Sequence, residues 1–180
     1  MIKKVTSLNE FQKCNLDQYD VIIVSKDFDI INSNELLNVG VDLYSIEDVI
    51  IKKNEAKIIK TGVKVYCTTG LFFDVRPRSS LFLKHQLLVA NSPGTTDPDY
   101  RGDVGLILLN IIKDEIKVKK GIRYCQLLLL PYYTLYPNHF QNHIDVPKIL
   151  YCYGVKEVYD NWEKILPSIR QSKGFGSTGI

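Results

Sequence analysis

Short apolar or alternating runs, separated by turn-forming residues, dominate this chain. A strand needs only about four to eight such residues, whereas a helix needs a longer stretch with a period near 3.6. The runs are 21–24, 41–44, 49–51, 57–60, 63–66, 71–75, 87–90, 104–112 and 124–130. Strands this short and this regularly spaced predict an all-β fold, either a sandwich or a barrel-like jelly roll.

Helix signals are few. Ser7 and Glu10 have the spacing of a capping box, although the periodic run behind them is only a turn or two. Ser79 is placed to cap a short helix over 81–85, and the free N–H groups of a helix start can face an anion. A last segment, 155–166, has a helical period and favours packing over catalysis. Its apolar face consists of Val155, Val158, Trp162 and Ile165, and Pro167 ends it.

Composition limits the classes of protein that the chain can belong to. Its 180 residues are 45% hydrophobic, which suits one domain with a substantial core. The formal net charge is only +3, and the basic residues are scattered among 20 acidic ones, which argues against nucleic-acid binding. The longest apolar run, 127–130, is far shorter than a membrane span, and the first residues lack the apolar core of a signal peptide. We therefore predict a soluble, cytoplasmic protein with no membrane or nucleic-acid partner.

Two sets of potential metal ligands have weak patterns. The four cysteines, at 14, 67, 125 and 152, show no CxxC spacing, which indicates reduced and mostly packed thiols. His139 and His143 are four residues apart, but Pro137 and the irregular composition around them favour a loop over a metal site. His85 is expected to pack.

The string NSPGTTDPDYRGDVG, at 91–105, combines a turn, a carboxylate expected to be buried and an aromatic ring. Its flanking runs, 87–90 and 104–109, predict an antiparallel hairpin. Asp97 follows the turn, and Pro98 pushes its backbone toward an extended conformation, which fixes where the carboxylate points. That arrangement suits a general base, although a polar turn with solvated aspartates is the simpler interpretation of the isolated string.

Four further segments surround this string. They are NVGVDLYS at 38–45, RPRSS at 76–80, GIRYCQLLLLP at 121–131 and KGFGSTG at 173–179. In this order, over residues 39–179, the five segments resemble the five motifs of the trimeric dUTPases, which hydrolyse dUTP to dUMP and pyrophosphate. The resemblance implies a jelly-roll enzyme that binds dUTP, requires Mg²⁺ and forms a homotrimer with shared active sites.

The resemblance also assigns roles to single residues. Asp97 is the general base that activates the water attacking the α-phosphorus. Arg78, Ser79, Ser80 and Gln126 bind the phosphates, although the family usually has glycine where Ser80 stands. Asp42 corresponds to the aspartate that holds a water of the magnesium ion; a strand-end carboxylate that caps a turn is the alternative.

The remaining roles concern the nucleoside and the tail. Asn91, Gly94 and Thr96 correspond to the edge that pairs with uracil, and Tyr100 to the ring that packs under deoxyribose and excludes a 2′-hydroxyl. Thr96 stands where the family often has Ile or Val. In the fifth motif, Gln171 and Lys173 replace common glycines. The tail residues implied to bind nucleotide are Arg170, Phe175, Gly176 and Ser177.

We predict one domain over 1–171, with an N-terminal extension at 1–25, an aromatic-rich insertion at 131–153 and a mobile glycine-rich lid at 172–180. Two other functions stay open. One is a dCTP deaminase, possibly bifunctional, although no segment matches the deaminase glutamate. The other is a regulatory protein that uses the insertion to engage a partner.

Overall fold

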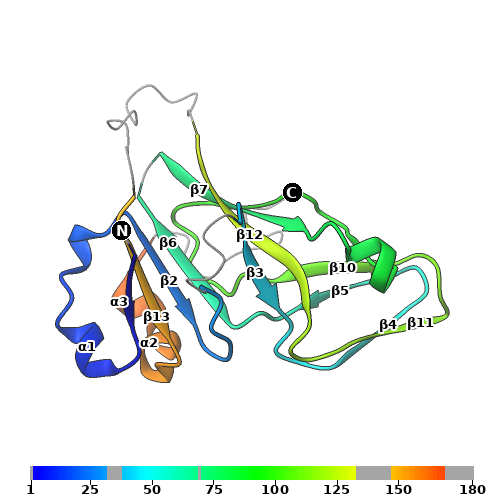
Figure 1. Cartoon of the computed structure of the whole chain (residues 1–180), viewed down its shortest axis with the longest axis horizontal. Coiled ribbons are helices and arrows are strands. Elements are labelled where there is room, and N and C mark those ends of the chain that lie inside the picture. Colours follow the sequence, from blue (N-terminus) through cyan, green and yellow to red (C-terminus); the bar gives the residue numbers. More distant parts are fainter. Residues whose placement is uncertain (1, 32–37, 69, 133–146, 169–180) are drawn as a thin grey trace.

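The computed structural model describes residues 2–31, 38–68, 70–132 and 147–168. Strands dominate it, and they form three sheets and a two-stranded ribbon (Figure 1). All nine strands predicted from the apolar runs are present, within a few residues at their ends. Residues 94–96, 115–118, 2–5 and 149–153 form four further strands that the pattern did not indicate.

The central sheet carries most of the candidate site residues. Its strand order is β3-β12-β7-β9, and every pair is antiparallel. The strands are β3 (Val41–Tyr44), β12 (Arg123–Pro131), β7 (Leu71–Pro77) and β9 (Gly94–Thr96). Cys125 and Leu127 of β12 are buried in the main core, whereas Gln126 between them is only partly buried. The sheet therefore has one core face and one more accessible face, as a sandwich requires.

A second sheet completes the main core. Its order is β5-β10-β8, with β5 (Glu55–Ile59), β10 (Leu106–Asn110) and β8 (Leu88–Val89). The predicted pairing of 87–90 with 104–109 is confirmed, because Val89 lies opposite Leu108. The segment between these two strands is not a simple turn, because it contains β9, which pairs with β7 in the central sheet. A ribbon of β4 (Val49–Lys52) and β11 (Glu115–Val118) extends the molecule.

The predicted N-terminal extension is joined to the end of the predicted insertion. Strand β13 (Ile149–Tyr153) lies parallel to both β1 (Ile2–Val5) and β2 (Val21–Ser25), and β6 (Val63–Cys67) completes the order β1-β13-β2-β6. Figure 1 shows β1, β2 and β13 side by side at one end of the molecule, next to the helices. Both segments outside the motifs therefore contribute to one sheet.

Helices cover the outer face of this N-terminal sheet and enclose a second apolar cluster. They are α1 (Leu8–Gln12), the 3-10 turn η1 (Leu16–Gln18), α2 (Lys156–Asp160) and α3 (Trp162–Ile165). Ser7 caps α1 as predicted, and the carboxylate of Glu10 accepts from the backbone N–H of Thr6. The single helix predicted over 155–166 is two short ones that meet at Asn161. Val155, Val158 and Trp162 nevertheless bury one face, as predicted.

The cysteines are free thiols, and three of them are buried. Burial raises the pKa of Cys67, Cys125 and Cys152 to about 12, so these thiols stay protonated near neutral pH. The prediction of reduced, packed cysteines is confirmed. Within the described part of the chain, no helix has the length and hydropathy needed to cross a membrane.

Candidate active site

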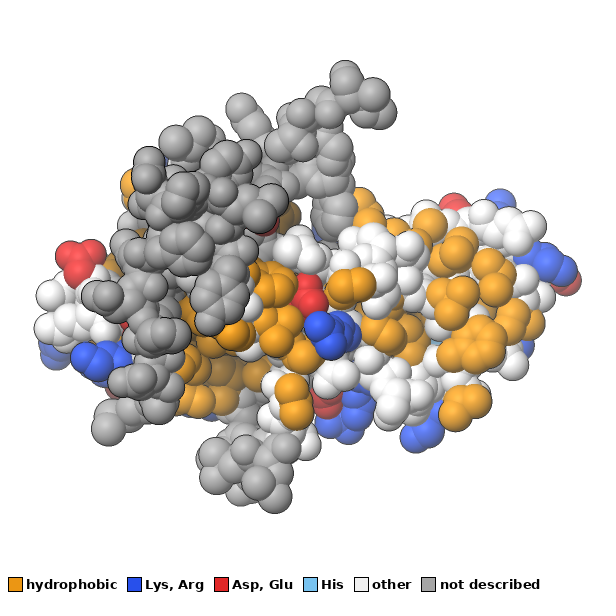
Figure 2. Space-filling view, turned by 90° about the horizontal axis from the view of Figure 1, so that it is seen from above, with side chains coloured by type: hydrophobic (Ala, Val, Ile, Leu, Met, Phe, Trp, Pro, Cys, Tyr) orange, Lys and Arg blue, Asp and Glu red, His pale blue; other side chains and the backbone are white. Residues whose placement is uncertain are grey.

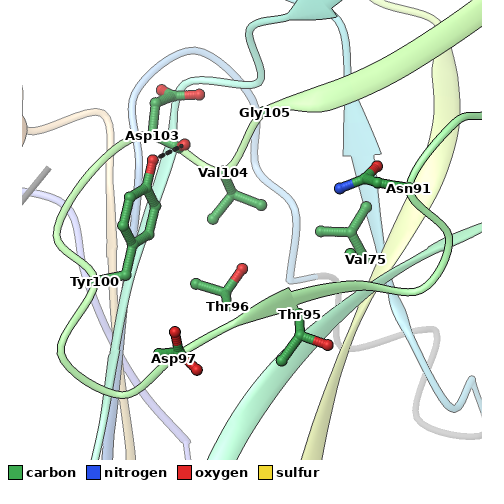
Figure 3. Close-up of a pocket in the computed structure, with 10 residues that line it drawn as sticks. Val75, Asn91, Thr95, Thr96, Asp97, Tyr100, Asp103, Val104 and Gly105 are labelled. Atoms are coloured by element: carbon green, nitrogen blue, oxygen red, sulfur yellow. Dashed lines mark hydrogen bonds between the residues drawn. The ribbon is translucent and has the colours of Figure 1, made fainter. Parts of the chain in front are cut away.

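A pocket of about 140 Å³ opens beside β9 (Figure 3). Most of its wall comes from the 91–105 string, together with one residue of β7. The lining residues are Val75, Asn91, Gly94, Thr95, Thr96, Asp97, Tyr100, Asp103, Val104 and Gly105. The structure thus brings together the predicted general base, the predicted uracil edge and the predicted sugar-packing ring.

Strand β9 is held in place by β7. Gly94 lies opposite Val75, and a Cβ atom on Gly94 would be 3.2 Å from the side-chain nitrogen of Asn91. Glycine at this position therefore lets Asn91 lie close to the strand. The buried carboxylate of Asp74 accepts hydrogen bonds from the hydroxyl of Thr95 (3.1 Å) and from Arg76 (3.0 Å). The Thr95 bond joins β9 to β7, and the Arg76 bond fixes the Asp74 carboxylate that accepts it, so the pocket edge is an ordered strand.

Asp97 lies directly after β9, where the chain turns. The backbone N–H of Tyr100 donates to the carbonyl of Asp97 at 3.1 Å, which closes a tight turn over DPDY. The expectation of a buried carboxylate is wrong, because Asp97 is exposed at the rim of the pocket. Its turn protrudes from the sheet, so few neighbours cover the side chain. Asp97 also lines a second, more apolar hollow with Phe72, Thr95, Pro98 and Tyr132.

Tyr100 folds back across its own loop. Its hydroxyl donates to the backbone carbonyl of Asp103 at 3.0 Å, as Figure 3 shows. A Cβ atom on Gly102 would lie 2.2 Å from that hydroxyl, so the ring occupies space that only glycine leaves open. The phenol ring therefore forms a fixed wall of the pocket.

Asp42, Arg78 and Gln126 meet elsewhere, on the central sheet. One carboxylate oxygen of Asp42 is 2.8 Å from Nε of Arg78, and the other is 2.9 Å from a guanidinium nitrogen of Arg123. Gln126 is the cross-strand partner of Asp42, and its amide donates to the carbonyl of Pro77 at 3.2 Å. The arrangement directs two guanidinium groups and an amide to one place, which is suited to an anion such as phosphate.

Ser79 and Ser80 lead into a single π-helical turn, η3 (Leu81–His85). The prediction that Ser79 caps it is wrong, because Ser80 occupies the N-cap position and its side chain makes no capping bond. With only five residues, the turn has too few aligned peptides for a strong dipole. His85 packs edge-on against Tyr124, with ring centroids 4.9 Å apart, and burial lowers its pKa.

In the described part of the chain, only one of the two groups of predicted residues contributes to the pocket beside Asp97. None of Asp42, Arg78, Ser79, Ser80 and Gln126 lines the pocket beside Asp97. In the described ranges, no cluster of three or more His, Cys, Asp or Glu residues could hold a metal ion. The predicted tail residues, at 170 and 175–177, and both histidines, at 139 and 143, lie outside the described residues.

Sequence reasoning missed several residues of these sites. Val75 forms a pocket wall, Asp103 lines the pocket, and Arg123 holds Asp42. Asp103 and Arg123 belong to the motif strings, so their charge alone was a usable signal. The pKa of Asp103 is raised above its usual value because the carboxyl is buried, and hydrogen bonds from Tyr159 and Thr61 offset part of that rise. Nothing in the local pattern separates Val75 from the other apolar residues of its strand.

Comparison with known proteins agrees with this arrangement. Residues 26–149 match the family model for dUTPase. The deoxyuridine 5'-triphosphate nucleotidohydrolase of Clostridium novyi (strain NT) is 37% identical over 141 residues, which cover 78% of this chain and 84% of that protein. The Clostridioides difficile protein of the same name is 40% identical over 141 residues, covering 78% and 83%.

A solved structure extends the likeness to the fold. A mutant dUTPase of Staphylococcus bacteriophage 80alpha, solved with dUpNHpp, superposes with a TM-score of 0.58 at 21% identity. The match covers 89% of this chain and 98% of that one. The predicted all-β jelly roll is thereby confirmed. With the family model spanning most of the sequence and the Asp97 pocket built from the third motif, the chain belongs to the dUTPase family.

Proposed function

We propose that this protein hydrolyses dUTP to dUMP and pyrophosphate, with Asp97 as the general base. The observation that carries the proposal is the pocket beside β9, where Asp97 and Tyr100 stand on the same loop next to the backbone of Gly94–Thr96. An exposed carboxylate at a pocket rim can reach a water molecule and the substrate together. General-base assistance of this kind contributes on the order of 10²–10⁴ in rate.

The pocket wall suits a pyrimidine nucleoside. The edge of β9 that does not pair with β7 offers backbone donors and acceptors at 94–96, and the side-chain amide of Asn91 lies beside it. Uracil and cytosine present opposite groups at position 4, so a fixed pattern of donors and acceptors can distinguish them. The ring of Tyr100 forms the wall against the sugar.

The group around Asp42 suits the triphosphate and its metal. Arg78, Ser79, Ser80 and Gln126 supply the donors for phosphate oxygens. A carboxylate has about four acceptor positions, and the two arginines use one on each oxygen of Asp42, so acceptor positions for metal-bound water remain. Asp42 would therefore hold Mg²⁺ through water, and the ion, bound to the triphosphate, would offset its negative charge.

A homotrimer would bring the two groups together. A neighbour's phosphate-binding group, and the tail residues at 170 and 175–177, would complete the pocket beside Asp97. The outward face of the β5-β10-β8 sheet supports a contact between copies, because it pairs Ile58 with Ile107 and Leu88 with Leu109. Ile58 and Leu88 are exposed. On the face of the molecule that Figure 2 draws, apolar side chains gather in the middle and toward the right-hand end. Apolar faces of this kind mark protein interfaces.

Pyrophosphate release tests the proposal directly. The full-length protein should release pyrophosphate from dUTP much faster than from dCTP, dTTP or UTP, and only with Mg²⁺ present. Ammonia release from dCTP would instead favour a deaminase. Turnover of all four nucleotides at similar rates would contradict the proposal.

Tyr100→Ala should narrow the discrimination of dUTP over UTP, because removing the ring opens space beside C2′ of the sugar. Losing a wall of this size costs about 1–3 kcal/mol of discrimination, so the ratio of kcat/KM values should fall about 10- to 100-fold. The measurement is kcat/KM for both nucleotides. Tyr44→Ala offers a control, since that ring stacks on Phe28 away from the pocket. An unchanged ratio in Tyr100→Ala would show that another residue excludes the 2′-hydroxyl.

A further inference from the structure

The helical segment α2–α3 lies outside the part of the chain that matches the dUTPase family model, yet it contacts the loop that carries Asp97. It does so at three places. The hydroxyl of Tyr159 donates to the carboxylate of Asp103. The Nε of Arg101 donates to the carbonyl of Leu166 at 2.9 Å. Just past α3, the hydroxyl of Ser168 donates to the carbonyl of Asp99 at 2.6 Å.

Both oxygens of the Asp103 carboxylate are held from outside the pocket loop. One accepts from Tyr159, and the other accepts from the backbone N–H of Thr61 at 3.2 Å. Two lysines face this pair. The ammonium of Lys64 donates to the carbonyl of Tyr159 at 3.1 Å and lies 4.4 Å from the centre of its ring, and that of Lys26 lies 5.4 Å from the same centre. The carboxylate is thus clamped between β6 and its preceding turn on one side and α2 on the other.

The position of Asp103 decides where Tyr100 lies. The backbone carbonyl of Asp103 accepts the hydrogen bond of the Tyr100 hydroxyl, and Gly102 provides the space under the ring. Because Asp103 is both clamped by Tyr159 and bonded to Tyr100, the segment α2–α3 is two hydrogen bonds away from the pocket wall.

Arg101 makes a parallel connection. Arg101 as a whole residue is only 4% exposed, and its guanidinium lies 5.0 Å from the centre of the Tyr66 ring. The guanidinium donates to the carbonyl of Pro98 at 2.7 Å and to that of Tyr100 at 3.0 Å. The same side chain reaches Leu166 at the end of α3. The carbonyls of the DPDY turn are therefore tied to the end of α3 through a single buried side chain.

We infer that α2–α3 braces the catalytic loop and that Tyr159 is a positioning residue, acting through Asp103 on the sugar-excluding ring of Tyr100. The expected effect of the brace on selectivity for dUTP over UTP rests on the proposed function. The brace gives a segment outside the five motifs a part in that function. The brace itself is a structural property that can be measured without substrate.

Tyr159→Phe removes the hydroxyl and keeps the ring over Lys64. A hydrogen bond to a charged group is stronger than one between neutral groups, and part of its effect reaches Tyr100, so the dUTP/UTP ratio of kcat/KM should fall about five- to tenfold. Amide hydrogen exchange over 97–103 should become faster by a similar factor. Tyr151→Phe is the matched control, because Tyr151 lies on β13 and its hydroxyl accepts from the N–H of Ile30 at 2.9 Å, away from the loop. This control should leave both the ratio and the exchange over 97–103 unchanged.

The outcomes separate the brace from the proposed function. A mere loss of folded protein lowers the rates with both nucleotides together, so it does not change their ratio. If Tyr159→Phe matches Tyr151→Phe in ratio and in exchange, the brace is wrong, whatever the wild-type protein hydrolyses. Exchange over 97–103 could accelerate only in Tyr159→Phe while the wild-type protein shows no preference for dUTP. That result would support the structural brace and contradict the proposed function. If exchange accelerates while the ratio holds, Tyr159 does not act on Tyr100, and its assignment as a positioning residue is overturned.

Discussion

Replacing Asp97 with asparagine should lower kcat for dUTP by about 100-fold or more, with little change in nucleotide affinity. Asparagine keeps the shape of the side chain and much of its hydrogen bonding, but it cannot accept the proton of the attacking water. The side chain stands exposed at the end of β9, so the substitution leaves no buried group unpaired and should cost little stability. The measurements are steady-state pyrophosphate release and the binding of a non-hydrolysable dUTP analogue.

Asp99→Asn makes the same chemical change two residues away. Asp99 is exposed, does not line the pocket, and contacts Ser168 through its backbone carbonyl, which the substitution keeps. We expect a near-normal kcat in this variant. Comparable losses in both variants would mean that the loop responds to charge in general, and near-normal turnover in Asp97→Asn would remove Asp97 from its proposed role.

A protein truncated after Gln171 should lose nearly all activity, since it lacks the phenylalanine, glycines and hydroxyls of the fifth motif, which would close the site and exclude water. The cut leaves Ser168 and its bond to Asp99, so the pocket loop keeps its contact with the segment after α3. Thermal unfolding of the truncated protein should therefore resemble that of the full chain. An active truncated protein would show that the tail is not part of the site.

Mixing this truncated protein with full-length Asp97→Asn tests whether sites are shared. Each protein alone lacks one essential group, and the two are refolded together in equal amounts. If base and tail at one site come from different chains, about a quarter of the sites in randomly mixed trimers have both, and activity should return to roughly that level. If each site takes its base and its tail from one chain, no mixed site is complete. Failure to regain activity, with mixed trimers confirmed by native mass spectrometry, would overturn the shared-site proposal.

Local pattern predicted the strands of the two core sheets well. The alternation along 63–66 reflects which face of the strand is buried, and 124–130 is a short, mostly apolar run; both are properties of neighbouring residues in the sequence. The pairing of β13 with β1 and β2 was not predictable in this way. Ile149 lies opposite both Ile2 and Val21, and no local periodicity encodes a partner more than about a hundred residues away. Strand β9 was missed because it is only three residues long and directly follows the turn formers Asn91 and Pro93.

The family, the jelly-roll class and the residue types of the candidate site follow from the sequence, because the motifs are contiguous strings whose chemistry can be recognised without coordinates. How these residues are grouped depends on the folded chain. It placed Asp97 and Tyr100 in one pocket and Asp42 with two arginines outside it, since strand pairing and side-chain direction set those positions. It also joined Tyr159 to Asp103, across 56 residues of sequence, because two segments of unrelated composition pack against each other there. Contacts of that kind arise from the packing of the whole chain, and no single segment carries a signal for them.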